Sequence, residues 1–313
     1  MRKTALIALA VSIALLGLAG ASSAGPIILA GTDADDHGNV AGGVNQSGWL
    51  YMQSALDNVG GQVTNANKLA VCIGCNAGQA QDAFASAFDL SSLPGAGWTR
   101  VTLTAAADIT NFMTDAGGGT KISQAGIIYM PTATGNITGG ITAAQVAPIN
   151  ANAAALNAYV AGGGGLFTQD QCPCYVGGGY GWLTTLLPGI VLHGDIDGTI
   201  ADSISLARTA AGIAAFPGIS DALLSGATPW HDWFSGNFGG LSVLVTGPAF
   251  INGTGQPPGP GAVVLGGGSG TVIQCGQPNQ PPCPNVPEPG TLLLLGSGLV
   301  ALGGVAWSRR RRN

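Results

Sequence analysis

A short stretch near the start of the chain combines three carboxylates with an imidazole. Asp33, Asp35, Asp36 and His37 fall within five consecutive residues. Carboxylate oxygens and imidazole nitrogens bind divalent cations such as calcium, and a carboxylate beside an imidazole can also supply a general base. The stretch is not an EF-hand, because His37 stands where Asp or Asn is required and Val44 where the bidentate Glu belongs. We therefore predict a cation site or an acid–base site here.

The two other histidines also have aspartates nearby. His193 precedes Asp195 and Asp197, and His231 precedes Asp232. If these loops meet the first stretch, all three histidines could contribute to one metal or acid–base site. The alternative is structural, because Asp and His also favour turns and helix caps. Loops that point apart would exclude a joint site.

The cysteines form three close pairs in the sequence: Cys72 and Cys75, Cys172 and Cys174, and Cys275 and Cys283. In an exported protein disulfides are the default, although their connectivity cannot be deduced from sequence. The first four cysteines could instead hold zinc. Cys72 and Cys75 have the spacing of a thioredoxin-like redox pair, a role that requires them to be exposed and reducible.

Hydrophobic patterns predict an α/β domain with a mostly parallel sheet, covered by helices on both faces. Strands are predicted at residues 26–31, 68–73, 98–104, 125–130, 166–168, 190–193, 241–246 and 262–265. Helices are predicted after a cap at Asn45, ending at Gly60, over residues 79–88 and 107–114, and from a cap at Thr142 to residue 161. In such sheets ligands bind beyond the carboxyl ends of the strands, where the Asp33–His37 stretch falls.

Both ends of the chain have the pattern of targeting segments. Residues 1–24 read as a cleaved signal peptide, with a basic start, an apolar run and small residues before the cleavage site. Residues 25–253 form the predicted domain, and 254–285 a last strand with a Gly- and Pro-rich spacer. Residues 291–307 are an uncharged apolar run, predicted to be a single membrane helix, and four arginines after it would stay cytoplasmic.

The charge of residues 25–285 limits the possible partners. This segment has four basic residues and fourteen aspartates, which gives a net charge of −10. Such a charge repels phosphate backbones, so we do not expect a nucleic-acid partner.

The C-terminal segment resembles the PEP-CTERM sorting signal of exported bacterial proteins. The resemblance rests on a Pro-Glu-Pro motif, an apolar run and a basic cluster, which occur in this order; the residues are Val286, Pro287, Glu288, Pro289, Arg309, Arg310, Arg311 and Arg312. It implies export with signal peptidase, cleavage near the motif by an exosortase-type membrane protease, and delivery to the cell surface. Families with this tail often occur beside exopolysaccharide production, which suggests extracellular polysaccharide as a partner.

Residues 127–170 resemble the class I glutamine amidotransferase-like fold, which is related in layout to flavodoxin. The resemblance rests on a strand ending in Met130-Pro131, a helix running into a Gly-rich stretch at 162–165, and a following strand and loop. In that family the loop presents a nucleophile, but Thr168, Gln169 and Asp170 include no cysteine. Residues 25–285 also lack a glutamate for the family's His–Glu pair, so the resemblance implies the fold and not the reaction.

Together these patterns predict an exported, non-enzymatic surface or matrix protein that binds divalent cations or exopolysaccharide. The alternative is a metal-assisted or Asp/His hydrolase that uses the Asp33–His37 stretch with His193 or His231.

Overall fold

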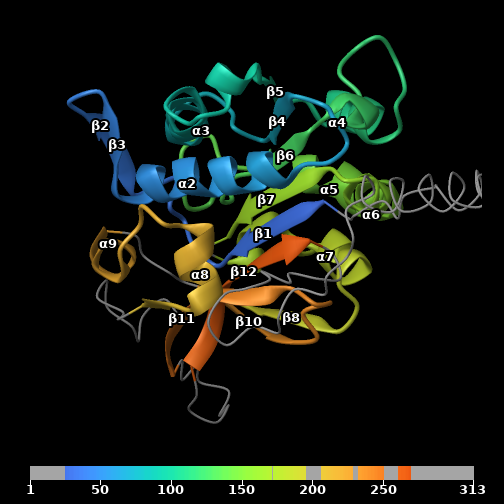
Figure 1. Cartoon of the computed structure of the whole chain (residues 1–313). Helices are drawn as coiled ribbons and strands as arrows, with labels where there is room; N and C mark the ends of the chain where they lie inside the picture. The colour runs from blue at the N-terminus through green and yellow to red at the C-terminus, as the bar shows by residue number, and fades with distance from the viewer. Residues whose placement is uncertain (1–24, 171, 195–205, 228–231, 250–259, 269–313) are drawn as a thin grey trace, which may run out of the picture. The chain divides into compact units, whose positions relative to one another are not determined.

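Short apolar runs form five parallel strands, which make up one half of the sheet (Figure 1). The computed structural model describes residues 25–170, 172–194, 206–227, 232–249 and 260–268. The parallel strands lie in the order β5-β4-β6-β7-β1. Their bounds are β1 Pro26–Ala30, β4 Leu69–Ile73, β5 Thr99–Leu103, β6 Ile127–Met130 and β7 Gly165–Gln169. Every residue of β1, β6 and β7 is buried, as expected for strands covered on both faces.

The other half of the sheet is antiparallel. Its strands are β8 Ile190–His193, β9 Ala207–Arg208, β10 Trp233–Gly236, β11 Ser242–Ala249 and β12 Pro260–Gly268. β12 pairs antiparallel with β1, β10 and β11, so it lies inside the sheet and not at its edge. The sequence predicts most of these strands but not their direction, because an apolar run looks alike in both orientations.

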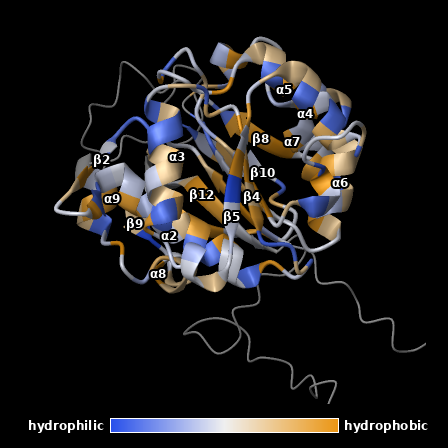
Figure 2. Ribbon diagram, turned by 90° about the horizontal axis from the view of Figure 1, so that it is seen from above, coloured by the Kyte–Doolittle hydropathy of each residue, from blue (hydrophilic) through white to orange (hydrophobic). Residues whose placement is uncertain are grey.

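Helices cover both faces of the sheet, as Figure 2 shows. One face packs against α2 Ser47–Gln62, α3 Gln79–Asp89, α8 Ala210–Ala215 and α9 Asp221–Ala227. The other face packs against α4 Ala106–Met113, α5 Ala143–Ala151, α6 Ala153–Ala161 and α7 Gly181–Leu186. The chain moves across the sheet in one direction from β4 to β5 and in the opposite direction from β5 to β7. With right-handed crossovers, this reversal places the connecting helices on opposite faces.

The predicted class, a mixed α/β fold with a central sheet flanked by helices, is confirmed, and the parallel pairing holds for the strands β5-β4-β6-β7-β1. The order of the strands differs from the flavodoxin order 2-1-3-4-5, in which the first strand lies between the second and the third. Here β1 lies beyond β7, and the connection through α2 crosses β7 and β6 before it reaches β4.

The start and end of α2 differ from the prediction. Gln46 occupies the N-cap position, whereas Asn45 is 1% exposed and its side-chain amide donates to Gln53 Oε1 at 2.9 Å. Asn45 therefore ties the helix entry to its second turn and does not cap it. The helix also continues through Gly60 to Gln62, and the Val63 backbone N–H after it still donates to the Val59 carbonyl at 3.1 Å.

The predicted helix over residues 142–161 is two helices. Thr142 caps α5 as expected, since its hydroxyl accepts a bond from the Gln145 backbone N–H at 3.3 Å. Asn152 separates α5 from α6 and its side chain donates to the Pro148 carbonyl at 2.8 Å. Asparagine competes with helical hydrogen bonds in this way, which explains the break.

Short elements complete the described part of the chain: a hairpin of β2 Gly38–Ala41 and β3 Val44–Gln46, and single turns η1 Pro94–Ala96, η2 Ile122–Gln124 and η3 Pro173–Val176. The chain divides into units 1–272 and 273–313, and the second lies outside the described residues. The predicted signal peptide and apolar C-terminal helix lie outside them too. Within the described ranges, no helix has the length and apolarity needed to cross a membrane.

Candidate functional site

The polar residues of interest gather at the carboxyl ends of β1, β6 and β7, where ligands bind in α/β sheets. The Asp33–His37 stretch follows β1, Thr132 follows β6 and Asp170 follows β7. These three strands are neighbours, in the order β6-β7-β1. These polar residues therefore lie at the edge of the sheet formed by the carboxyl ends of the strands, where the sequence predicts ligand binding.

Asp33, Asp36 and His37, three of the four residues of the Asp33–His37 stretch that the sequence singles out, converge. His37 Nε2 lies 3.3 Å from Asp33 Oδ2 and 3.7 Å from Asp36 Oδ2. One ligand atom from each residue lies within 4.8 Å of the other two, so the three side chains could hold one metal ion. Asn136 donates to Asp33 Oδ2 at 2.8 Å, which positions that carboxylate from the loop after β6. Asp33 is 1% exposed, whereas Asp36 and His37 reach solvent.

The charges of this cluster favour the protonated imidazole. Burial lowers the pKa of His37, but the hydrogen bond that its ring donates to Asp33 and the charges of Asp33 and Asp36 outweigh burial, and the net pKa is raised. Burial also raises the pKa of Asp36, against the opposing effect of His37. A metal ion must compete with a proton for His37, so cation binding here weakens as the pH falls.

Asp35 points away from this cluster and into the protein. Its carboxylate is fully buried and accepts bonds from the Thr132 backbone N–H at 2.9 Å and the Thr132 hydroxyl at 2.8 Å. Burial raises its pKa to about 7, although the bonds from Thr132 oppose the shift. The residue that the sequence groups with the cation ligands thus serves a separate network.

This network joins β1, β6 and β7. The Tyr129 hydroxyl lies 3.4 Å from Asp35 Oδ2 and accepts a bond from Gln169 Nε2 at 2.7 Å. Tyr129 and Thr132 are not predictable as site residues, because one polar residue inside or after an apolar strand gives no periodic signal. The one available argument is that a buried aspartate needs hydrogen-bond partners, but the sequence does not say which residues these are.

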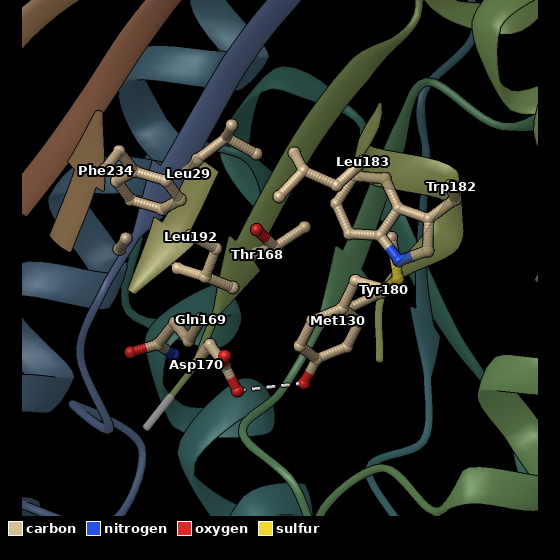
Figure 3. A pocket seen from close by; sticks show the side chains of 11 residues that line it. Leu29, Met130, Thr168, Gln169, Asp170, Tyr180, Trp182, Leu183, Leu192 and Phe234 are labelled. Atoms are coloured by element: carbon tan, nitrogen blue, oxygen red, sulfur yellow. Dashed lines mark hydrogen bonds between the residues drawn. The ribbon is translucent and has the colours of Figure 1, made fainter. Parts of the chain in front are cut away.

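A small cavity lies at the carboxyl ends of β1, β6 and β7, and Gln169 of the network is part of its lining (Figure 3). Its volume of ≈ 20 Å³ is enough for about one water molecule. Leu29, Leu192 and Phe234 are part of its apolar lining, and Tyr180 donates to Asp170 Oδ1 at 2.9 Å at its polar side. Burial, followed by the charge of Asp170, raises the pKa of Tyr180 well above its usual range.

The structure does not bring His193 into the Asp33 cluster. Its Nε2 lies 2.7 Å from Ser235 Oγ, and its ring stacks on Trp233 with centroids 3.9 Å apart. Burial lowers the pKa of His193. His231, Asp195 and Asp197 lie outside the described residues.

Asp232, which the sequence singles out only as the neighbour of His231, lies next to the end of β1. It is fully buried, and its backbone N–H donates to the Gly31 carbonyl at 3.2 Å. The residue is therefore close to the end of β1, which carries the cation cluster, although the two are about two hundred residues apart in the sequence.

Four cysteines form disulfides, as expected for an exported protein, and each bonds to its neighbour in the sequence. Cys72 pairs with Cys75 and Cys172 with Cys174, so these four offer no free thiolates for zinc. Cys72 and Cys75 are both 0% exposed, so the exposure that a thioredoxin-like role requires is missing. Cys275 and Cys283 lie outside the described residues.

Comparison with known families identifies the C-terminal segment. Residues 285–312 match the PEP-CTERM protein-sorting motif. No curated protein and no solved structure matches the chain. The motif implies export as a precursor that passes through a membrane and is processed by an exosortase. The amidotransferase resemblance stays a prediction.

Proposed function

We propose that the chain is a cell-surface or matrix protein that an exosortase-type protease releases by cleavage near Pro287-Glu288-Pro289. The observation that carries the proposal is the match of residues 285–312 to the sorting motif. The motif places its only glutamate, Glu288, between two prolines and its arginines after an apolar run. In this proposal the protease recognises Glu288, and Glu288 has no role in the function of the mature domain.

The test follows the size and location of the protein in a host with an exosortase and in the same host without it. Glu288→Gln, and separately replacement of Arg309–Arg312 by Gln, should leave an unprocessed precursor in the membrane fraction. Gln280→Ala, upstream of the motif, is the matched control and should be processed like the wild type. Normal processing of both motif variants, or processing without the exosortase, would contradict the proposal.

For the domain that the tail delivers, we propose binding of a divalent cation by Asp33, Asp36 and His37. The support is their convergence within 4.8 Å at the carboxyl end of β1. Two carboxylates and one imidazole form a mixed ligand set, which suits Zn²⁺ or Mn²⁺ better than the all-oxygen coordination of Ca²⁺. Extracellular polysaccharide stays a predicted partner of the surface protein.

Thermal melting with EDTA, Ca²⁺, Mn²⁺ or Zn²⁺ tests the cation site. A cation that binds only the folded state adds about 2.7 kcal/mol of stability at about 100 times its Kd. Asp33→Ala and Asp36→Ala should each abolish the shift, whereas Asp108→Ala on exposed α4 should retain it. An equal shift in all four proteins, or none with any ion, would rule the site out.

A metal-assisted or Asp/His hydrolase is the alternative proposal, and one contact favours it. His37 Nε2 lies within reach of Asp33 Oδ2, which could orient the imidazole as a general base. His193 is engaged with Ser235 instead, so the alternative rests on His37 alone among the described histidines. Hydrolysis of a model ester or glycoside that His37→Gln abolishes would support it.

A further inference from the structure

The two described disulfides differ in how solvent reaches them. Cys72 lies in β4 and Cys75 lies two residues after the end of this strand, and both are completely buried in the core. Cys172 is 4% exposed, whereas its partner Cys174 is exposed in the loop after β7. An external thiolate can attack a disulfide only through a sulfur that it can reach. Only the second disulfide offers such a residue.

We propose that Cys172–Cys174 is a reversible thiol–disulfide exchange site for an external dithiol, and that Cys72–Cys75 is purely structural. Exposure of one partner and burial of the other make the site directional, since Cys174 receives the attack and Cys172 is the leaving group. This assignment differs from the sequence-based expectation, which placed a redox role at the Cys-x-x-Cys pair. The cysteine spacing shows neither the burial of one pair nor the exposure of the other.

The exchange proceeds in two balanced steps. A thiolate of the dithiol attacks Cys174 Sγ, the Cys172–Cys174 bond breaks, and Cys172 leaves with the electron pair. The second thiol of the reductant then attacks the mixed disulfide, which releases Cys174 and oxidises the reductant to its own disulfide. The two protons of the dithiol end on Cys172 and Cys174, so the protein is reduced by two electrons.

One contact in the structure supports Cys172 as the leaving group. The Cys174 backbone N–H lies 3.3 Å from Cys172 Sγ and donates to it. A hydrogen bond to a sulfur stabilises its thiolate, and a better-stabilised thiolate leaves faster. A negative charge on Asp170, two residues before Cys172 in the chain, opposes this effect, because it disfavours a second anion.

The loop around the disulfide borders the candidate site. A Cβ added at Gly194 would lie 2.3 Å from Pro173 Cδ and 3.3 Å from Asp232 Oδ1, so Pro173 lies close to that buried carboxylate. After the disulfide, Gly177, Gly178 and Gly179 all have positive φ, a conformation that glycine adopts most easily. The same loop then supplies Tyr180 to the cavity. Reduction therefore releases a constraint on a segment that lines the strand ends.

The first experiment measures reduction in the native protein. The oxidised, exported protein is treated with increasing dithiothreitol without denaturant, alkylated with iodoacetamide and analysed by peptide mass spectrometry. Cys172 and Cys174 should be alkylated at a dithiol concentration about tenfold lower than Cys72 and Cys75. Simultaneous reduction of all four cysteines, or earlier reduction of Cys72 and Cys75, would overturn the proposal.

The second experiment tests the direction of attack with matched variants. Cys172→Ser leaves the exposed Cys174, and Cys174→Ser leaves the buried Cys172. With oxidised glutathione, the first variant should form a mixed disulfide about tenfold faster than the second. The double variant is the control and should not react at these positions. Equal or reversed rates in folded variants would contradict the assignment, and if a variant fails to fold, the reduction experiment on the wild type decides.

Discussion

At the scale of single residues, the Asp33–His37 stretch divides its carboxylates between two tasks. Asp33 and Asp36 face His37, whereas Asp35 is buried under Thr132 and Tyr129. A buried carboxyl group keeps its proton up to a higher pH, and the Asp35 pKa of about 7 reflects this. The protonation state of Asp35 should thus make the stability of the hydrogen-bond network between β1, β6 and β7 depend on pH.

Stability should fall as the pH rises, and Asp35→Asn should remove much of this dependence. The pKa of Asp35 is raised from 3.8 to about 7 on folding. The folded state therefore binds more protons between these values, so stability falls progressively as the pH rises from about 4 to about 7. Between about pH 5 and about pH 8 the loss is on the order of 3 kcal/mol. The raised pKa values of Asp36 and His37 act in the same direction. Urea unfolding at about pH 5 and about pH 8 measures the effect.

The control for this prediction is Asp108→Asn, an exposed aspartate of α4. It should retain the wild-type loss of stability between the two pH values, whereas Asp35→Asn should be more stable than the wild type at the higher pH. Parallel pH dependence in the wild type and in Asp35→Asn would show that Asp35 does not titrate as described.

The sequence predicted part of the site because those residues are neighbours in the chain. Asp33, Asp36 and His37 lie within one loop, so their approach needs only local geometry. Asp232 and Tyr129 reach the same region through the pairing of distant strands, which no local pattern encodes. The orientation of Asp35 depends likewise on Thr132, nearly a hundred residues later in the chain.

At the scale of elements, α2 contains two consecutive glycines in different surroundings. A Cβ added at Gly60 would lie 2.3 Å from Leu93 Cδ2, and Leu93 is buried. A Cβ added at Gly61 would meet nothing within 4 Å. The sequence suggested that the pair ends the helix, but the first glycine allows close packing and the second has no packing role.

Alanine substitutions should separate these two glycines. Gly61→Ala should stabilise the protein by about 0.4–1 kcal/mol, because alanine restricts the unfolded chain and favours the helix. Gly60→Ala gains the same propensity but must displace Leu93, which should give a net loss of about 1–3 kcal/mol. Chemical denaturation of the two variants and the wild type measures both effects. A gain of stability in Gly60→Ala equal to that in Gly61→Ala would contradict the close packing.

The elements themselves were more predictable than their order. Periodicity located β1, β4, β6 and α3 to within two residues, since each has a continuous apolar run or an apolar helix face. The crossing of α2 over β7 and β6 follows from pairing across the whole domain, and no short segment contains that information.

At the scale of the whole molecule, β12 holds the two halves of the sheet together. It pairs with β1 on the parallel side and with β10 and β11 on the antiparallel side. Val263, Val264 and Leu265 are completely buried. The strand thus belongs to the folded domain, and it covers the strand predicted at residues 262–265.

Removal of β12 should show that the folded domain depends on this strand. A protein of residues 25–253 lacks β12 and should fail to unfold cooperatively, because β1, β10 and β11 each lose a hydrogen-bond partner and the core loses its central valines. A protein of residues 25–285 should melt in one cooperative transition. Circular dichroism during heating, with a dye that binds exposed apolar surface, distinguishes the two. Equal midpoints for both proteins would show that β12 is dispensable.

The pairing of β1 with β12 also sets the time at which folding can finish. Ile27 and Ile28 find their antiparallel partners only when Gly267 and Gly266 have emerged, after nearly all of the described sequence. Contacts between such distant segments form slowly, because the closure of a long loop precedes any gain from pairing. For a chain that crosses a membrane in an unfolded, extended form, late formation of these contacts reduces the risk of folding before export is complete. β1 can pair with β7 earlier, but its other edge is completed only when β12 is available.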